Sequence, residues 1–295
     1  MNGLTNKSSN PKNLKRKFPL VSVIVAAYNE AENLSNLLES IKSQTYPSIE
    51  TIVIDDASTD NTAAIARSFT SKVFTRPHLE RSAQRNYGAS IANGLYLLFL
   101  DADMRLDAEV ITSCTKLMLN NRNVKSIIIP EISYGEGYWA KCKALERNCY
   151  VGDKLIEAPR FFYRKDFLKL GGYNPKMISG EDWDFHRRIK YYGKTDRTDN
   201  YIYHYEGRFT LFKDLKKKSY YASQAGPFID SNINNYNTII KFLFRPAFFK
   251  NWNLLLKDPI HAFGMLIMKF LEFVIGGFVI IFQSKFWKNT FRSDT

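Results

Sequence analysis

The sequence predicts an α/β fold: a mostly parallel sheet flanked by helices, followed by a C-terminal helical segment. Strand-like apolar runs alternate with helical patterns between residue 21 and about residue 133. Polar side chains follow the ends of these runs, and from about residue 206 the chain becomes basic, aromatic and apolar. Such alternation is typical of parallel sheets covered by helices. With 295 residues the chain can form one large domain and an appendage.

The alternation begins with "VSVIVAAY" at 21–28, a β-branched run typical of a strand buried on both faces. Leucine and isoleucine then recur at helical spacing over 34–41. The elements expected after these are strands at 49–56, 72–76, 95–103 and 124–133, and helices at 58–69, near 82–93 and at 108–119.

Polar side chains collect where three of these strands end. In parallel α/β sheets, ligands bind outside the carboxyl ends of the strands. Neither the glycine-rich turn of a dinucleotide fold nor the Walker loop follows these strands, so a cation is expected to hold any bound phosphate. The residues that predict this cleft are Asn29, Glu30, Asp55, Asp56, Asp101 and Asp103.

Two aspartates, in the sequence Asp101-Ala102-Asp103, end the fourth apolar run. In an extended backbone both carboxylates project to the same side, where they can share a divalent cation such as Mn²⁺ or Mg²⁺. The cation would hold a nucleotide diphosphate and stabilise the charge that grows on it as it leaves. The alternative is a solvated turn at the strand end.

Four segments occur in a characteristic order and spacing: "VSVIVAAYNEAENL", "IVIDDASTDNT", "RSAQRNYGASIANGLYLLFLDAD" and "GGYNPKMISGEDWDFHRRI". Together they resemble family 2 glycosyltransferases, which have the Rossmann-like GT-A fold. The resemblance covers about residues 19–189. It implies a GT-A catalytic domain at 19–206, between a basic flexible lead-in at 1–18 and a basic, aromatic helical region at 207–295.

The resemblance also implies roles for the residues at the strand ends. Asp103 would be the main metal ligand, and Asp101 would lie nearer the ribose and diphosphate. A flat aromatic ring suits a flat base, and a carboxylate accepts from a ring N–H. Capping of the next helix is the alternative role for Asp55 and Asp56. For Arg81 and Arg85, which resemble family positions near the diphosphate, the alternative is a place on a solvated helix face. The implied nucleotide-sugar ligands are Ala26, Tyr28 (stacking on the base), Glu30, Asp56 (accepting from the base), Arg81, Arg85, Asp101, Ala102 and Asp103.

An acidic pair, Glu181-Asp182, begins an amphipathic helix. Sugar transfer with inversion needs a base that takes the proton of the acceptor hydroxyl. By the resemblance Asp182 is this base and Glu181 is the alternative, while Trp183 would lie against a donor or acceptor sugar. A charged helix start without catalysis is the structural alternative.

Three further features carry expectations. Asp184 is expected to pair with Arg187 or Arg188, and Gly171-Gly172 is expected to form a close turn under the donor sugar. His204 ends an expected strand; some relatives carry a histidine near the diphosphate, although a lone histidine is more often structural. The Gln/Arg-x-x-Arg-Trp motif of processive members does not occur in the sequence, so one sugar per acceptor is expected.

The segment from residue 262 to 282 is a candidate membrane helix whose only charges are Lys269 and Glu272. About twenty apolar residues suffice to cross a bilayer. It could span the membrane, lie in the interface or pack on the soluble domain. The net charge of +13 suggests a polyanionic partner, and the basic residues accompany apolar runs and match no nucleic-acid-binding signature. The start of the chain lacks a signal-peptide core, and three cysteines without metal-ligand spacing indicate a reducing compartment.

These observations predict an inverting, metal-dependent glycosyltransferase on the cytoplasmic side of the cell membrane. It would move one sugar from a UDP- or GDP-sugar to a polyprenyl- or dolichyl-linked glycan, for glycan or protein N-glycan assembly. A dolichyl- or polyprenyl-phosphate sugar synthase, whose acceptor is the bare lipid phosphate, is the first alternative. A sugar-1-phosphate nucleotidyltransferase and a non-enzymatic membrane scaffold or nucleic-acid binder are further alternatives. Loops around 134–151 and 207–224 are expected to select the sugar and the acceptor.

Overall fold

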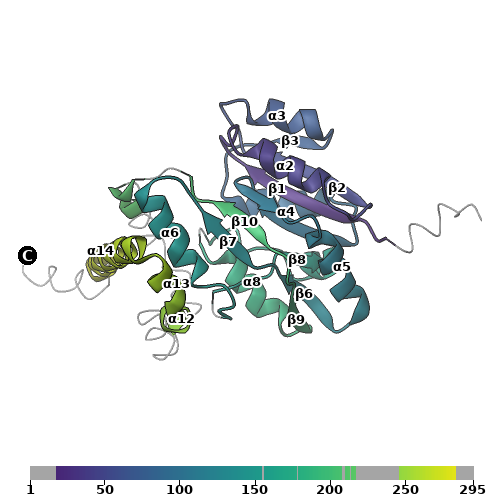
Figure 1. The fold of residues 1–295 in the computed structure, drawn as a ribbon. Helices are drawn as coiled ribbons and strands as arrows, with labels where there is room; N and C mark the ends of the chain where they lie inside the picture. The colour runs from purple at the N-terminus through teal and green to yellow at the C-terminus, as the bar shows by residue number, and fades with distance from the viewer. Residues whose placement is uncertain are drawn as a thin grey trace, which may run out of the picture.

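The computed structural model describes residues 18–283 except 155, 178, 208–209, 213 and 217–245, and it describes only the backbone of 276–283. The lead-in expected at 1–18 therefore lies outside the described residues, apart from Phe18. Figure 1 shows a sheet with helices on both sides, and a group of helices from the C-terminal part of the chain at one side of it. The expected α/β class is confirmed.

The main sheet has seven strands in the order β3-β2-β1-β4-β8-β6-β9. The first four strands in this order are parallel, β8 runs antiparallel to both of its neighbours, and β9 is parallel to β6. The sheet is therefore mostly parallel, as predicted. The strands are β1 (Val21–Ala27), β2 (Ile49–Asp55), β3 (Val73–Thr75), β4 (Tyr96–Asp101), β6 (Val124–Ile128), β8 (Phe161–Tyr163) and β9 (Lys194–Arg197).

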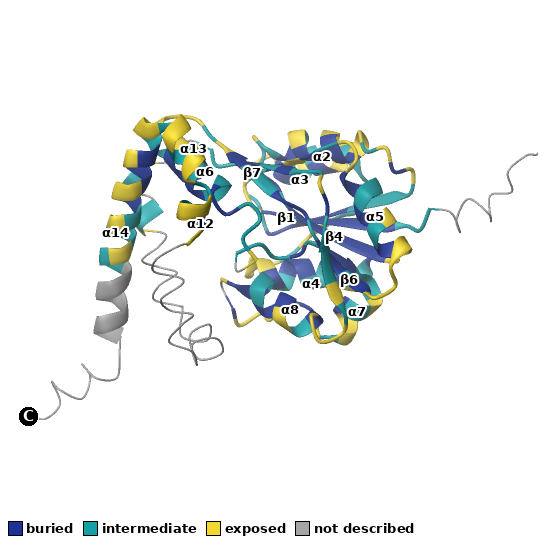
Figure 2. Ribbon diagram, turned by 60° about the horizontal axis from the view of Figure 1, so that its bottom comes forward, coloured by how far each residue is buried: buried dark blue, intermediate teal, exposed yellow. Residues whose placement is uncertain are grey.

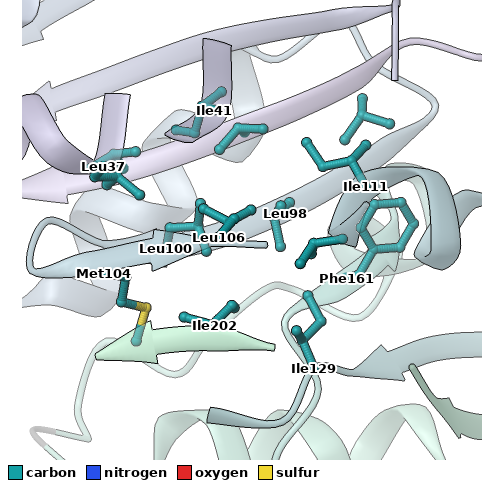
Figure 3. Packing of buried hydrophobic residues seen from close by; sticks show 14 of the residues in the cluster. Leu37, Ile41, Leu98, Leu100, Met104, Leu106, Ile111, Ile129, Phe161 and Ile202 are labelled. Carbon is teal, nitrogen blue, oxygen red and sulfur yellow. The ribbon is translucent and has the colours of Figure 1, made fainter. Parts of the chain in front are cut away.

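Helices cover both faces of this sheet because successive strand residues point to opposite sides. Val23 and Val25 of β1 belong to one apolar cluster, and Ile24 between them belongs to another. Figure 3 shows part of the first cluster, in which Leu37 and Ile41 lie over the face of the sheet that carries Leu98 and Leu100. The first cluster includes residues of α2 (Leu34–Lys42), α3 (Thr62–Phe69) and α5 (Val110–Asn120), and the second includes residues of α4 (Arg81–Ile91), α7 (Arg164–Lys169) and α8 (Glu181–Ile189).

The single strand expected at 124–133 is wrong, because the chain forms two strands there in two different sheets. The main-sheet strand β6 ends before Pro130, which has no N–H to donate to a ladder. The next residues form β7 (Glu131–Tyr134), which joins a small sheet of order β5-β10-β7. This sheet is completed by β5 (Met104–Leu106) and β10 (Ile202–Tyr205). It positions the end of β10 beside the turn that follows β4.

A helical layer lies beyond the small sheet, at the side of the molecule away from β1 and β2 (Figure 1). The long helix α14 (Pro259–Gln283) packs on α6 (Tyr138–Asn148). Cys142 of α6 contacts Met265 and Met268 of α14 there, in a separate apolar cluster. The candidate membrane segment 262–282 lies within this long helix; within the described part of the chain, no helix combines the length and the sustained apolarity that crossing a bilayer requires. The elements of the layer are α6 (Tyr138–Asn148), α12 (Pro246–Lys250), α13 (Trp252–Lys257) and α14 (Pro259–Gln283).

Candidate active site

The carboxyl ends of β1, β2 and β4 meet in register. Ala26 lies opposite Asp101 in the neighbouring strand, and Ala27 lies opposite Asp55. A pocket of about 370 Å³ opens at this edge. It is lined by eight of the residues predicted to bind the nucleotide sugar, namely Ala26, Tyr28, Glu30, Asp56, Arg81, Asp101, Ala102 and Asp103. Gln84, Arg147 and His204 also line it.

Tyr28, which lines this pocket, lies against a second aromatic ring, that of His78. The centroids of the Tyr28 and His78 rings are 4.5 Å apart, and the Tyr28 side chain is half-exposed. His78 Nδ1 lies 2.9 Å from Asp56 Oδ2. His78 was not among the predicted site residues, although it follows the short strand β3 and so lies at the same edge of the sheet as the other strand ends. The arrangement offers a flat aromatic surface next to a carboxylate.

The buried carboxylate of Asp56 serves this pocket and does not cap the next helix. Its Oδ1 accepts hydrogen bonds from the Leu79 backbone N–H, at 2.9 Å, and from the Gln84 side-chain amide. At the start of α3 the corresponding acceptor is Asp60, whose Oδ1 is 2.9 Å from the Thr62 backbone nitrogen. The helix start is therefore served by Asp60, which leaves Asp56 at the pocket edge.

Three guanidinium groups surround Asp101 at the end of β4. Arg85 Nη2 donates to its Oδ1, Arg160 Nη2 lies 3.4 Å from its Oδ2, and Arg81 Nη1 lies 3.9 Å from Oδ1. Burial alone would raise the pKa of Asp101, but the guanidinium charges outweigh it and hold the pKa well below its ordinary value. Asp101 is thus a fixed anion that orders arginines at the floor of the site. Arg160 was not predicted, because no motif of the sequence includes it.

Asp103 has a different environment from Asp101. The chain turns at Ala102 and Asp103, between β4 and β5, so the expected extended Asp-Ala-Asp backbone is wrong and the two carboxylates are held separately. Asp103 Oδ2 lies 3.1 Å from His204 Nε2, which β10 carries. Asp103 Oδ1 is buried and has no hydrogen-bond partner among the residues that the structure describes. Buried polar atoms are rarely left unpartnered, so this oxygen is suited to a ligand.

A divalent cation would fit between Asp103 and His204. A carboxylate oxygen and an imidazole nitrogen are both ordinary ligands of Mn²⁺, and an anionic ligand in the pocket would supply further oxygens. The described residues contain no group of three or more acidic, histidine or cysteine side chains placed to hold a metal together. Two protein ligands leave the other coordination positions of the metal to substrate oxygens and water. This arrangement suits a metal that binds together with a phosphate-bearing substrate. His204, expected to be structural, is therefore a candidate ligand.

A second, larger pocket of about 570 Å³ adjoins the first and shares Arg81, Arg147 and Glu206 with it. Asp182 and Trp183 of α8 line it. The indole Nε1–H of Trp183 donates to the Ile156 carbonyl at 2.7 Å, which fixes the ring in the wall. Lys143 and Glu146 of α6, Lys269 of α14, Arg85 and Arg160 also line this pocket.

The two acidic residues at the start of α8 are used differently. Glu181 is buried and lies 3.1 Å from Arg85 Nη1 and 3.5 Å from Arg81 Nη2, whereas Asp182 lines the larger pocket. Burial and the neighbouring Asp182 charge raise the pKa of Glu181, against the opposing effect of the two arginines. Because Arg85 binds both Asp101 and Glu181, it links the end of β4 to the start of α8.

The family model described as "Glycosyl transferase family 2" matches residues 22–272. The chain belongs to glycosyl transferase family 2. The glycosyltransferase AglE of Haloferax volcanii is 41% identical over 185 residues, which cover 58% of this chain and 61% of AglE. The chondroitin synthase of Pasteurella multocida is 24% identical over 238 residues, 75% of this chain and 24% of that protein. The matched part of the chain thus spans less than two thirds of either relative.

Solved structures show the same fold. The mannosyltransferase PcManGT of Pyrobaculum calidifontis, in complex with GDP-Man and Mn²⁺, superposes with a TM-score of 0.56 at 18% identity, covering 88% of this chain and 87% of that chain. S. aureus TarS 1-349 superposes with a TM-score of 0.52 at 19% identity, covering 86% of this chain and 80% of that chain. Likenesses at this identity establish the architecture alone. They confirm the predicted GT-A fold.

Two smaller expectations about this family 2 glycosyltransferase are confirmed in the α8 region. Asp184 pairs with Arg187 at 3.2 Å and with Arg188 at 2.8 Å. Gly171 and Gly172 both have positive φ, and a Cβ on Gly172 would collide with the Asn86 side chain. The close turn before α8 therefore requires glycine. Whether a donor sugar lies over it remains a prediction.

Proposed function

We propose that this family 2 glycosyltransferase is an inverting, metal-dependent enzyme that transfers one sugar from a UDP- or GDP-sugar to a lipid-linked glycan. The observation that carries the proposal is the pair of adjoining pockets, with Asp103 and His204 on one side and Asp182 on the other. One pocket has the features of a nucleotide site and the other has the volume for two sugars. Binding of GDP-Man and Mn²⁺ by a neighbour of the same fold supports the donor class.

The smaller pocket suits the nucleotide diphosphate. Tyr28 would stack on the base, and Asp56, held by Gln84 and Leu79, would accept from a ring N–H. Asp103 and His204 would hold the cation, which when bound neutralises the diphosphate as it leaves. Asp101 contributes by fixing arginines: Arg81, which lines both pockets, would lie against the departing phosphate.

The larger pocket suits the bond-forming step. Inversion requires the acceptor oxygen to attack the anomeric carbon on the face opposite the diphosphate. The Asp182 carboxylate would take the hydroxyl proton while the new carbon–oxygen bond forms, and the old bond breaks with its electron pair going to the nucleoside diphosphate. Glu181 is a poor alternative base because it is buried and paired with Arg85 and Arg81.

The acceptor is proposed to be a glycan on a polyprenyl or dolichyl carrier at a cytoplasmic membrane surface. Aromatic faces such as Trp183 stack on sugars, and its fixed ring forms a wall beside Asp182. The bare lipid phosphate remains the alternative acceptor, and the two can be separated by which acceptor is glycosylated.

A donor panel tests the proposal. The detergent-solubilised chain is incubated with Mn²⁺, a set of nucleotide sugars and either a lipid-linked sugar or a lipid phosphate, and nucleoside diphosphate release is measured. We expect release from one donor, with glycosylation of the lipid-linked sugar. Glycosylation of the lipid phosphate alone would replace the acceptor. Pyrophosphate release from a nucleoside triphosphate and a sugar phosphate would replace the whole proposal with a nucleotidyltransferase.

The metal assignment is tested by Asp103→Asn, with the exposed carboxylate variant Asp199→Asn as the matched control. Loss of a direct ligand should weaken Mn²⁺-dependent donor binding by at least the roughly tenfold to hundredfold that loss of an outer-shell partner costs, measured by calorimetry with and without EDTA. The control should bind like the parent chain. Mn²⁺-dependent binding that is unchanged in Asp103→Asn would remove this residue from the metal site.

A further inference from the structure

Exposed residues recur along α12, α13 and α14 (Figure 2), and all three helices carry large apolar side chains among them. On α14 they recur every three or four residues and so form one face of the helix. Phe263 and Phe270 are 66% exposed. Single exposed apolar residues are ordinary, but several large ones on one helix face and on the two preceding helices mark an interaction site. We call these side chains together the apolar face; they are Phe249, Trp252, Leu256, Ile260, Phe263, Leu266, Phe270 and Phe273.

The opposite side of α14 fixes the helix to the catalytic domain. Gly264 lies so close to α6 that a Cβ there would collide with the Tyr138 hydroxyl and the Cys142 sulfur. Met265 and Met268 are fully buried on the same side. Because the inner side is packed in this way, the α14 part of the apolar face is turned away from α6 and the other described elements that α14 packs against.

The two charges of the apolar segment also point inward. Lys269 Nζ lies 2.7 Å from Glu146 Oε1 and 2.5 Å from Glu272 Oε2, and Lys143 Nζ lies 2.8 Å from Glu146 Oε2. These four side chains form an ionic cluster between α6 and α14, in which Lys143 and Glu146 are buried and Lys269 and Glu272 are partly buried. The cluster places the charges of Lys269 and Glu272 on the inner side, so the apolar face carries neither of them.

Charge favours an anionic bilayer over a second copy of the chain as the occupant of this face. Exposed Lys250 and Lys257 lie on the same two short helices as the apolar side chains of α12 and α13. The net charge of +13 makes two copies repel each other, whereas anionic headgroups attract such a surface. A helix with a one-sided apolar face and basic neighbours is typical of a segment that lies in the membrane interface.

The same helix links this face to the active site. Lys269 on the inner side of α14 lines the larger pocket, together with Lys143 and Glu146 of α6. We propose that the apolar face docks the protein on a bilayer containing anionic lipid, with the larger pocket held next to the membrane. Its use in presenting a lipid-linked acceptor to Asp182 rests on the proposed function, whereas the docking itself does not.

Vesicle binding tests the docking without substrate. The full chain is sedimented with phosphatidylcholine vesicles with and without phosphatidylglycerol. We expect stronger binding with phosphatidylglycerol, and a loss of about tenfold for each phenylalanine removed in Phe263→Ser/Phe270→Ser. The control, Leu119→Ser/Tyr191→Ser, removes exposed apolar side chains elsewhere and should bind like the parent. Equal binding by both double variants, or no binding by the parent, would overturn the proposal.

A second variant isolates the charge contribution. Lys250→Glu/Lys257→Glu should reduce the preference for phosphatidylglycerol by about fivefold or more per lysine, since each basic residue near an anionic surface contributes about 1 kcal/mol. An unchanged preference would contradict the charge argument. Gel filtration tests whether a second copy of the chain occupies the apolar face instead. If the parent is a dimer and Phe263→Ser/Phe270→Ser is a monomer with unchanged vesicle binding, the face serves self-association.

Donor turnover keeps the two proposals separate. Nucleoside diphosphate release in detergent should be equal for the parent and Phe263→Ser/Phe270→Ser, because neither side chain lines either pocket. Normal turnover with lost vesicle binding supports the docking surface. Vesicle binding without turnover of any nucleotide sugar would leave the docking in place and defeat the proposed function.

Discussion

The smaller pocket and the α6–α14 side of the larger pocket are built in different ways. We call the first, which we propose binds the nucleotide, the nucleotide end, and the second the helical end. At the nucleotide end, polar side chains follow parallel strands, and the sheet alone brings Ala26, Asp55 and Asp101 into register. At the helical end, the ionic cluster joins a pair on α6 to a pair on α14, and Glu146 and Lys269 in it are 123 residues apart in sequence. The gathering of the strand ends follows from the strand–helix order of the chain, whereas the ionic cluster follows from the packing of two helices distant in sequence.

The difference has a functional side. Charges at the nucleotide end are arranged around a position for a ligand: Asp101 is occupied by arginines while Asp103 Oδ1 is left for a partner. Charges at the helical end satisfy one another, since Lys143 and Lys269 both contact Glu146. We infer that substitutions at the first end change binding or chemistry, whereas those at the second change stability and the position of α14.

The sharpest test of this difference is Asp182→Asn. Loss of the base should lower the transfer rate by roughly a thousandfold. Donor affinity should change by less than about twofold, since the side chain lines the larger pocket and not the nucleotide pocket. Single-turnover transfer and calorimetric donor binding measure the two quantities.

The neighbouring variant Glu181→Gln is the control for Asp182→Asn. It removes a carboxylate that Arg85 and Arg81 contact, so it should weaken donor binding more than Asp182→Asn does. Parental transfer rates in Asp182→Asn would show that Asp182 is not the base. A larger rate loss in Glu181→Gln than in Asp182→Asn would assign the base to Glu181.

The sequence predicted that polar side chains gather at the ends of β1, β2 and β4, because this prediction needs only the order of strands and helices. A buried run that ends on Asp101 implies a polar strand end, and strand ends of a parallel sheet gather at one edge. His204 and Arg160 were undervalued or missed because their relation to Asp101 and Asp103 depends on β8 and β10, which pair far from their places in the chain. The strand expected through Pro130 failed for the same reason: the small sheet that takes β7 is not visible in any local pattern.

At the helical end, the sequence shows Lys269 and Glu272 three residues apart, and in the structure these two side chains form an ion pair. It could not show that Glu146 and Lys143 join them, because nothing in α6 indicates its distant partner. The side of α14 that packs inward is therefore known only from the structure. For this reason the sequence left three alternatives open for residues 262–282: a helix that spans the membrane, one that lies in the membrane interface, or one that packs on the soluble domain.

The ionic cluster makes a stability prediction. Lys143→Met leaves Glu146 and Glu272 with Lys269 as their shared cation, so the free energy of unfolding should fall by about 3 kcal/mol. The exposed variant Lys165→Met should change it by less than about 0.5 kcal/mol. Urea unfolding followed by circular dichroism measures both. Equal values for the two variants would mean that the cluster does not stabilise the helical end.

The smallest expected effect concerns α8, which carries Asp182 and lies between the two ends. His186 on its inner side is buried beside Thr195 of β9, with Nε2 3.2 Å from the threonine hydroxyl. Burial, with the nearby Lys190 charge, lowers the pKa of His186 from 6.5 to about 4. Below pH 6.5 the unfolded chain therefore binds a proton that the folded chain does not, so this contribution to stability is complete above pH 6.5 and is lost as the pH falls toward 4.

The loss should amount to about 1–2 kcal/mol between pH 6.5 and pH 4, after allowance for solvent screening. His186→Gln keeps a polar side chain near Thr195 but does not titrate, so its unfolding free energy should depend less on pH in this interval by that amount. Urea unfolding of both proteins at pH 7.5, 6, 5 and about 4 gives the comparison. Parallel pH profiles would show that His186 is protonated without cost in the folded state, and the acid sensitivity of α8 would then have to come from its carboxylates.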